Sequence, residues 1–160
     1  PCGYYNDPNH HCTCTPTQVQ RYKSKISGPL LDRIDIQIEV APVSVTELAR
    51  APKGEPSASI RERVIAARAI QTERYKNEHG VHCNAQMSRA MIEQFAQLDA
   101  EAAQSLQRAM RRLDLSARAY DRILKVARTI ADLDASPQIA ARHIKEAIGY
   151  RSLDRGDWGE

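Results

Sequence analysis

Residues 115–133 read LSARAYDRILKVARTIADL, and this stretch decides how the chain can fold. Ser116 is a good helix N-cap, because its hydroxyl can accept a hydrogen bond from a backbone N–H of the first turn. Apolar residues then recur on one helical stripe, formed by Ile123, Ala127, Ile130 and Leu133. The stretch therefore predicts an amphipathic helix that packs by this stripe and leaves Arg118 exposed in its first turn.

Further helices are predicted on both sides of this stretch. Their ranges are 59–78, closed by Gly80, then 88–96, 99–113 and a last helix from Ser136-Pro137 onward. The N-terminal signals are a capping box at Ser59 and Glu62, single caps at Ser88 and Asp99, and Pro137 in a first turn. We expect these helices to form a small bundle whose core consists of Leu, Ile, Ala and Val, since the chain has one Phe and one Trp.

The first 58 residues carry different signals. Thr15-Pro16-Thr17-Gln18 predicts a helix to about Lys25 that Gly28-Pro29 ends, and Ser44 with Glu47 predicts a short helix to about Arg50. Between them apolar residues alternate with polar ones at Ile34, Ile36, Ile38 and Val40, which predicts a half-buried strand over 35–40. Residues 51–57, APKGEPS, have the composition of a linker.

Two motifs carry a resemblance to a known family. The run Gly28-Pro29-Leu30-Leu31-Asp32-Arg33-Ile34-Asp35 resembles the arginine-finger region of the AAA+ ATPases related to magnesium chelatase, in particular of the ComM-type branch. Residues 115–133 resemble the sensor-2 helix of the same family. The resemblance runs through nearly the whole chain and thins only in the linker and the tail.

The resemblance implies a fold that is mainly α. It makes 1–50 the remnant, helix plus strand, of the α/β ATPase core, 51–58 a linker, 59–153 the C-terminal AAA+ helical lid, and 154–160 a flexible tail. It also implies that Arg33 reaches the γ-phosphate in a neighbouring subunit and that Arg118 contacts the nucleotide of its own subunit. A guanidinium suits both roles because it is planar and stays charged. From the residues alone, Arg33 reads equally well as part of a surface Asp-Arg pair, and Arg118 as a solvated helix residue.

The chain contains no Gly-x-x-x-x-Gly-Lys-Ser/Thr loop and no acidic strand that would hold magnesium, the Walker A and Walker B elements. We therefore expect that it does not hydrolyse ATP alone. The resemblance places the half that binds ATP and Mg²⁺ upstream, so the chain is interpreted as the C-terminal part of a longer protein.

Composition allows one sizeable domain, with 160 residues of which 42% are hydrophobic. There is no apolar run of the roughly 20 residues that cross a bilayer and no signal-peptide pattern, so we expect a cytoplasmic protein without a membrane partner. The formal charge of +3 is too small to indicate nucleic-acid binding. A local basic cluster could face nucleotide or DNA phosphates or be a solvated helix face; it comprises Arg108, Arg111, Arg112, Arg118, Arg122, Lys125 and Arg128.

Three of the four cysteines lie near the start. Cys2, Cys12 and Cys14 could supply three sulfurs of a tetrahedral zinc site, or be free thiols, while Cys83 reads as an inert thiol. The resemblance supplies a fourth sulfur, because family members carry Cys-Pro-Cys-Gly where this chain begins Pro1-Cys2-Gly3. Without it His10 or His11 would have to substitute, so we expect Zn²⁺ in the parent protein and none in this chain.

For the ComM-type branch the resemblance implies a hexameric ATPase that works as a DNA helicase, migrating branched DNA during recombination in natural transformation, which is the competence pathway. Branched or single-stranded DNA is then the expected partner. Two alternatives stay open. One is a magnesium-chelatase ATPase subunit that remodels a metal-insertion partner, and the other is a non-enzymatic helical adaptor that binds DNA or protein.

Overall fold

The computed structural model describes residues 1–40 and 42–151. The helices are α1 (Pro16–Lys23), α2 (Gly28–Leu31), α3 (Val45–Arg50), α4 (Ser57–Arg74), α5 (Arg89–Phe95), α6 (Ala100–Arg112), α7 (Ala117–Leu133) and α8 (Ala141–Gly149), with one turn of 3-10 helix, η1, at Asn84–Gln86. The predicted fold class, mainly α with a C-terminal helical bundle, is confirmed. The predicted flexible tail, 154–160, lies outside the described residues.

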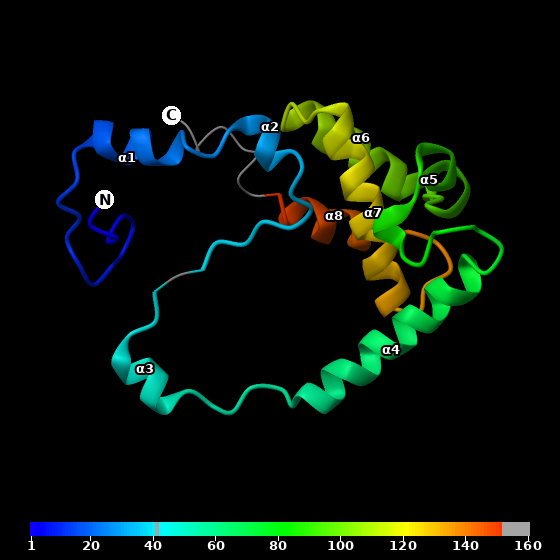
Figure 1. Cartoon of the computed structure of the whole chain (residues 1–160), viewed down its shortest axis with the longest axis horizontal. Coiled ribbons are helices and arrows are strands. Elements are labelled where there is room, and N and C mark those ends of the chain that lie inside the picture. The colour runs from blue at the N-terminus through cyan, green and yellow to red at the C-terminus, as the bar shows by residue number, and fades with distance from the viewer. Residues whose placement is uncertain (41, 152–160) are drawn as a thin grey trace.

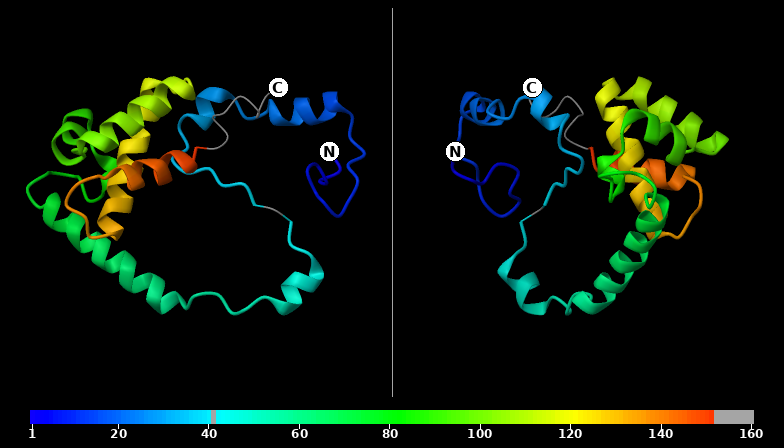
Figure 2. Two further views of the ribbon diagram at one scale, coloured as in Figure 1. Left: turned by 180° about the vertical axis from the view of Figure 1, so that it is seen from behind. Right: turned by 45° about the vertical axis from the view of Figure 1, so that its right-hand side comes forward.

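The molecule has two unlike parts (Figure 1). Helices α4 to α8 gather into a bundle, in which α7 contacts α4, η1, α5 and α8, and α6 packs on α8. Helices α1, α2 and α3 follow one another along an open path that passes the bundle at α2 and returns to it through α4; the two views of Figure 2 show the same path. Within the described residues, no helix has the length and hydropathy needed to span a membrane.

Helix α7 is the centre of the core. Ile123 and Ala127 are fully buried and Ile130 is nearly so, as predicted. Leu133 is 47% exposed, so the buried stripe ends at Ile130, before the last residue of the predicted stripe. The core side chains around α7 are Tyr75, Met87, Met91, Ile92, Ala96, Ala102, Leu106, Leu124, Ala131, Ile139, Ile144 and Ala147. Burial of this continuous apolar surface is the main stabilising contribution to the bundle.

Most predicted N-caps are confirmed. The hydroxyl of Ser116 accepts from the N–H of Ala119 at 3.1 Å, and Asp99 and Ser88 cap α6 and α5 in the same way. Thr15 and Ser44 form the predicted capping boxes of α1 and α3. Local side-chain chemistry therefore sets these five helix starts.

Two helix starts were predicted wrongly. Helix α4 begins at Ser57, not Ser59, because the carbonyl of Pro56 already accepts from the N–H groups of Ser59 and Ile60. It also ends at Arg74, before the predicted residue 78. Helix α8 begins at Ala141 rather than after Ser136.

Tertiary contacts explain the late start of α8. The guanidinium of Arg128 donates to the carbonyls of Ser136 and Pro137, and Ile139 pairs with Leu98 in an isolated parallel bridge. These contacts keep 136–139 out of the helix, and the local helix signal at Ser136-Pro137 does not overcome them.

Near the start of the chain, α1 ends at Lys23, and Gly28-Pro29 opens the short helix α2 instead of only ending α1. The predicted strand 35–40 is also wrong, because among the described residues it forms only one bridge, between Gln37 and Arg151. The N–H of Gln37 donates to the carbonyl of Tyr150 at 2.7 Å, and Gln37 is the buried residue. The alternating residues Ile34, Ile36, Ile38 and Val40 are instead 40%, 50%, 66% and 82% exposed. A strand without neighbouring strands cannot pair its backbone groups.

Candidate functional site

Arg33 follows the short helix α2 in a turn that the structure leaves accessible. Its side chain is exposed, and Nη1 donates to the carbonyl of Pro29 at 2.7 Å, which holds the guanidinium back over α2. It forms no ion pair with another residue of the described ranges. A charged group held by one carbonyl and facing solvent is available to an external anion.

Arg118 lies in the first turn of α7 and is also exposed. Ser116, which caps this turn, donates from its hydroxyl to Oδ2 of Asp32 at 3.1 Å while accepting from Ala119. A hydroxyl can do both at once. The contact brings the turn that carries Arg33 next to the turn that carries Arg118, and α2 indeed lies beside the start of α7 in Figures 1 and 2. The two predicted nucleotide arginines are thus on neighbouring turns, although 85 positions separate them.

Fewer residues of the predicted basic cluster are free to bind a partner than the sequence suggests. Arg122 forms an ion pair with Asp35 at 2.6 Å, Lys125 donates to the carbonyl of Ala85 at 3.0 Å, and Arg128 is buried. The remaining members are exposed and form no hydrogen bond to other described residues; they are Arg108, Arg111, Arg112 and Arg118. These four guanidinium groups at the α6–α7 turn are the basic surface that an anionic partner could meet.

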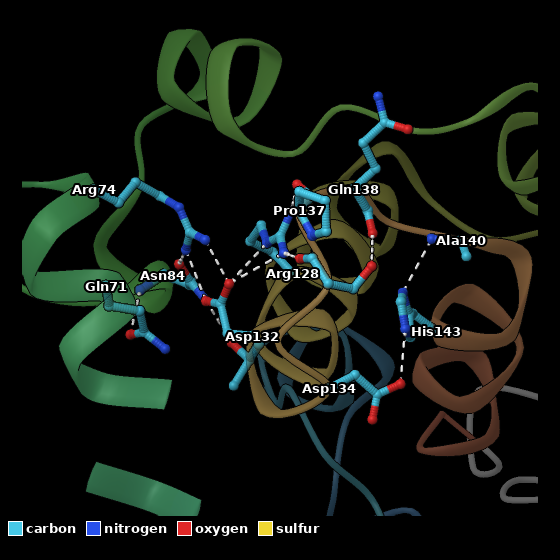
Figure 3. Close-up of polar contacts among 12 residues, drawn as sticks. Gln71, Arg74, Asn84, Arg128, Asp132, Asp134, Pro137, Gln138, Ala140 and His143 are labelled. Carbon is cyan, nitrogen blue, oxygen red and sulfur yellow. Dashed lines mark hydrogen bonds and ion pairs between the residues drawn. The ribbon is translucent and has the colours of Figure 1, made fainter. Parts of the chain in front are cut away.

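A buried ionic network ties α4 to α7, and sequence reasoning missed it (Figure 3). Asp132, 2% exposed, accepts from Arg74 at 2.7 Å, from Asn84 at 2.8 Å and from Arg128 at 3.1 Å. The hydroxyl of Tyr75 donates to Asn84 at 2.7 Å. The four-residue spacing of Arg128 and Asp132, beside the apolar stripe of α7, was the available signal.

The charges of this network show its structural role. Burial lowers the pKa of Arg128, while the hydrogen bond to Asp132 raises the pKa of Arg74. The carboxylate of Asp132 thus accepts hydrogen bonds from two guanidinium groups. Arg128 also donates to the carbonyls of Ser136 and Pro137, which precede α8. The network fixes the relative position of α4, α7 and the start of α8 and offers no exposed reactive group.

His143 has a structural role as well. It is buried, its Nδ1 accepts from the N–H of Ala140 at 3.0 Å, and its Nε2 lies 3.0 Å from Oδ2 of Asp134 (Figure 3). Because Nδ1 accepts, Nε2 carries the proton and donates to Asp134. Arg142 and His143 together lower the pKa of Asp134. The ring therefore takes the part that the Glu or Gln at N3 plays in a capping box at the start of α8.

The predicted thiol cluster, Cys2, Cys12 and Cys14, comes together in the structure. The three Sγ atoms lie within 4.8 Å of one another, and those of Cys2 and Cys12 are 3.5 Å apart. Zinc with Zn–S bonds of about 2.3 Å holds its tetrahedral sulfurs about 3.8 Å apart, so the arrangement fits three ligands of such a site. Hydrogen bonds from the backbone N–H groups of Tyr4 and Thr13 lower the pKa of Cys2 to about 6, which favours the thiolate that a metal binds.

The two histidines that would have to substitute for the missing sulfur do not reach the thiol cluster. His10 bonds to Asp7 at 3.0 Å and stacks on Tyr4 at 4.7 Å between ring centroids. His11 is exposed and lies outside the group formed by the three thiols. Within the described residues the cluster therefore offers three ligands, and the substitution by His10 or His11 is not supported.

Comparisons with known proteins agree along nearly the whole chain. Residues 54–151 match the family model described as magnesium chelatase, subunit ChlI C-terminal, and residues 1–48 match the model described as magnesium chelatase, subunit ChlI. The chain is 41% identical to the uncharacterized protein YifB of Escherichia coli and 42% identical to the competence protein ComM of Haemophilus influenzae, in each case over 97% of the chain. It is 30% identical to an uncharacterized protein of Mycobacterium tuberculosis over 94% of the chain. It spans only 29–30% of the length of these relatives.

Proposed function

Because this chain belongs to the magnesium chelatase ChlI family, we propose that it is the C-terminal part of a hexameric AAA+ ATPase of the ComM type. The parent protein would bind ATP and Mg²⁺ through residues outside this chain. The 42% identity to the competence protein ComM over 97% of the chain supports this branch of the family.

Within that ring, Arg33 would act in trans as the arginine finger and Arg118 as sensor 2 in its own subunit. The observation that carries this proposal is that both guanidinium groups are exposed and that neither forms an ion pair with a carboxylate of the described residues. Charge builds on the γ-phosphoryl group during transfer, and a guanidinium supplied by a neighbour neutralises it. As sensor 2, Arg118 would contact the bound nucleotide and so couple the state of that nucleotide to the position of the helical lid.

ATP hydrolysis would drive the migration of branched DNA, as in recombination during natural transformation. Support comes from the competence protein among the relatives and from the exposed arginines of the α6–α7 turn, which suit phosphate contacts. Single-stranded DNA is a further partner that the same charges suit. The protein would work in the cytoplasm, where the DNA is.

A magnesium-chelatase ATPase subunit that remodels a metal-insertion partner is the second candidate, since both matching family models are described by that subunit. A third is an adaptor that binds DNA or protein through Arg108, Arg111 and Arg112 without nucleotide. The first two candidates differ in the partner that stimulates ATP turnover. The adaptor differs from both because its binding does not depend on ATP turnover.

The thiol cluster would hold Zn²⁺ in the parent protein, with the fourth ligand supplied from outside the described residues. The three converging thiols and the low pKa of Cys2 support a thiolate site. Such a metal would order the first fourteen residues before α1.

The test is ATP turnover by the full-length parent protein, with and without branched DNA, in the variants Arg33→Ala and Arg118→Ala. We expect Arg33→Ala to lower turnover by about 10³-fold with nucleotide binding retained, and Arg118→Ala to weaken nucleotide affinity or coupling. Arg61→Ala on α4, another exposed arginine, is the matched control. Turnover indifferent to DNA would favour the remodelling subunit, and wild-type turnover in Arg33→Ala would refute the finger.

A further inference from the structure

We propose that the N-terminal loop and helix α1 bind single-stranded DNA, with bases stacked on Tyr5 and Tyr22 and a phosphate bound to Arg21. Together with Lys23 and Lys25 these residues form what we call the tyrosine surface. The proposal rests on the proposed function, which makes DNA a partner of the parent protein. It adds a DNA contact that is separate from the α6–α7 turn and from the two nucleotide arginines.

The first feature of the tyrosine surface is its unbalanced charge. Arg21, Lys23 and Lys25 lie within five positions of one another, and α1 contains no acidic residue. Before residue 32 the chain has one acidic residue, Asp7, whose carboxylate lies 3.0 Å from Nδ1 of His10. A cationic segment with so few carboxylates attracts a polyanion.

The second feature is that its aromatic rings are open to solvent. Tyr5 and Tyr22 are 51% and 57% exposed. The ammonium of Lys23 lies 5.0 Å from the centroid of the Tyr5 ring, and that of Lys25 lies 5.7 Å from the centroid of the Tyr22 ring. Each exposed ring therefore has a cation beside it. Proteins that bind single strands combine these two groups, because bases stack on the rings while cations meet the phosphates.

The third feature is a pair of grooves that share Arg21. One groove, of about 890 Å³, has Tyr5 and Lys23 among its lining residues. The other, of about 680 Å³, is bordered by Tyr22 and Lys25. Arg21 is exposed and lines both, so a phosphate bound to it would lie next to both tyrosines. This arrangement suits successive nucleotides of a single strand, whereas a duplex keeps its bases stacked inside and cannot use the rings.

The thiol cluster joins the two parts of the tyrosine surface. The Sγ atoms of Cys2 and Cys12 are 3.5 Å apart, and the N–H of Cys2 donates to Sγ of Cys14 at 3.1 Å, two residues before α1. Tyr5 belongs to the loop between Cys2 and Cys12, and Tyr22 belongs to α1. The cluster thus holds the loop that carries one ring against the helix that carries the other, which is a positioning role.

The tyrosine surface lies away from the helical bundle. Figures 1 and 2 show the N-terminal loop and α1 at one end of the molecule and helices α4 to α8 at the other. A single strand bound here would leave the arginines of the α6–α7 turn open to a second stretch of DNA.

The test measures the affinity of the full-length parent protein for a fluorescent oligothymidylate of about 16 nucleotides by anisotropy. A non-hydrolysable ATP analogue is present, so that turnover plays no part. Tyr5→Ala and Tyr22→Ala should each weaken binding about tenfold, because each removes one stacked base. Tyr5→Phe and Tyr22→Phe, which keep the ring, should retain the affinity. The matched control is Tyr4→Ala, since Tyr4 is 43% exposed but stacks on His10 and lines neither groove.

The phosphate contact has a separate readout. Arg21→Gln should lower the slope of log affinity against log salt concentration by about 0.7, the value for one phosphate of a single strand. Arg61→Gln on α4, also an exposed arginine, is the control and should leave the slope unchanged. An unchanged slope in Arg21→Gln would remove the phosphate from Arg21.

The outcomes separate the tyrosine surface from the proposed function. Wild-type affinity in both Tyr5→Ala and Tyr22→Ala, or an equal loss of affinity for a duplex of the same length, would overturn the surface while leaving DNA-stimulated turnover in place. Tighter binding of oligouridylate than of oligothymidylate would overturn DNA as the occupant. Turnover by the wild type that is indifferent to DNA would instead overturn the proposed function.

A second measurement does not depend on how the variants fold. Wild-type protein is cross-linked by light to an oligonucleotide that carries 5-iododeoxyuridine, and the attached peptides are identified by mass spectrometry. We expect cross-links at Tyr5 and Tyr22, because the base must lie against the ring to react. Cross-links confined to other parts of the parent protein would contradict the proposal.

Discussion

Helices α7 and α8 carry regular apolar patterns, as does the alternating run 34–40, but only the two helices bury most of theirs. Ile123 and Ile144 of the bundle are fully buried, whereas Ile36 and Val40 of the alternating run are 50% and 82% exposed. The stripe of α7 meets α4, α5 and α8, while the alternating run meets no second strand among the described residues. Periodicity thus identifies the face to be buried, and burial itself depends on the partner available.

The largest contrast should come from the buried charges. Asp132→Ala would leave Arg74 and Arg128 without their shared carboxylate, and breaking a buried pair costs about 3–5 kcal/mol. Urea unfolding of the chain, followed by circular dichroism, measures the loss. Glu55→Ala removes the exposed partner of Arg63 and should change little. Equal effects of the two variants would mean that the network does not stabilise the bundle.

A second contrast compares isoleucines that the sequence alone treats alike. Ile123→Ala in the core should cost about 2–5 kcal/mol, because it removes packed methyl groups and leaves a cavity. Ile38→Ala, where the side chain is 66% exposed, should cost less than about 0.5 kcal/mol. Both are read from the same unfolding curves. A large loss for Ile38→Ala would show that the run is packed in solution.

These contrasts explain which features could be predicted from sequence. Caps at Ser88, Asp99 and Ser116 act within one turn, so the local sequence predicts those helix starts. The start of α8 could not be predicted, because it depends on Arg128 taking two carbonyls from 136–137. The prediction of a strand over 35–40 was wrong for a similar reason. Whether a segment forms a strand depends on neighbouring strands, which its own residues do not determine.

The candidate site divides in the same way. The motifs predicted Arg33 and Arg118 individually, and the three cysteines as a group. Their juxtaposition through Asp32 and Ser116 spans 84 positions and needed the fold. The sequence also could not predict which arginines are free, because only three-dimensional contacts distinguish the paired Arg122 from the exposed Arg118.

A smaller contrast uses two matched helix caps. Ser116→Ala should lower the stability of the bundle by about 1 kcal/mol, since α7 is its central helix. Ser44→Ala removes the equivalent cap of α3, which stands apart from the bundle, so only the local helix should fray. Hydrogen exchange resolves the two effects by residue. Loss of global stability in Ser44→Ala would show that α3 is coupled to the bundle.

The smallest effect concerns the thiol cluster. With its pKa near 6, Cys2 is mostly thiolate at pH 7, so its alkylation by iodoacetamide should slow only as the pH falls below about 6. An unperturbed cysteine in a peptide, with a pKa of about 8.5, would already slow below about pH 8.5. Mass spectrometry of each cysteine gives the rates. In the parent protein Zn²⁺ should slow the alkylation of Cys2, Cys12 and Cys14 together and leave the rate at Cys83 unchanged, whereas unchanged rates at all four cysteines would exclude the site.

The most direct test of the central claim is ATP turnover by mixed rings of the full-length parent protein. One subunit type carries Arg33→Ala, and the other lacks a functional phosphate-binding loop. If Arg33 acts across the subunit interface, each type alone is inactive and mixing them restores part of the turnover, because some interfaces then combine an intact loop with an intact finger. Wild-type turnover by Arg33→Ala rings alone would contradict the assignment.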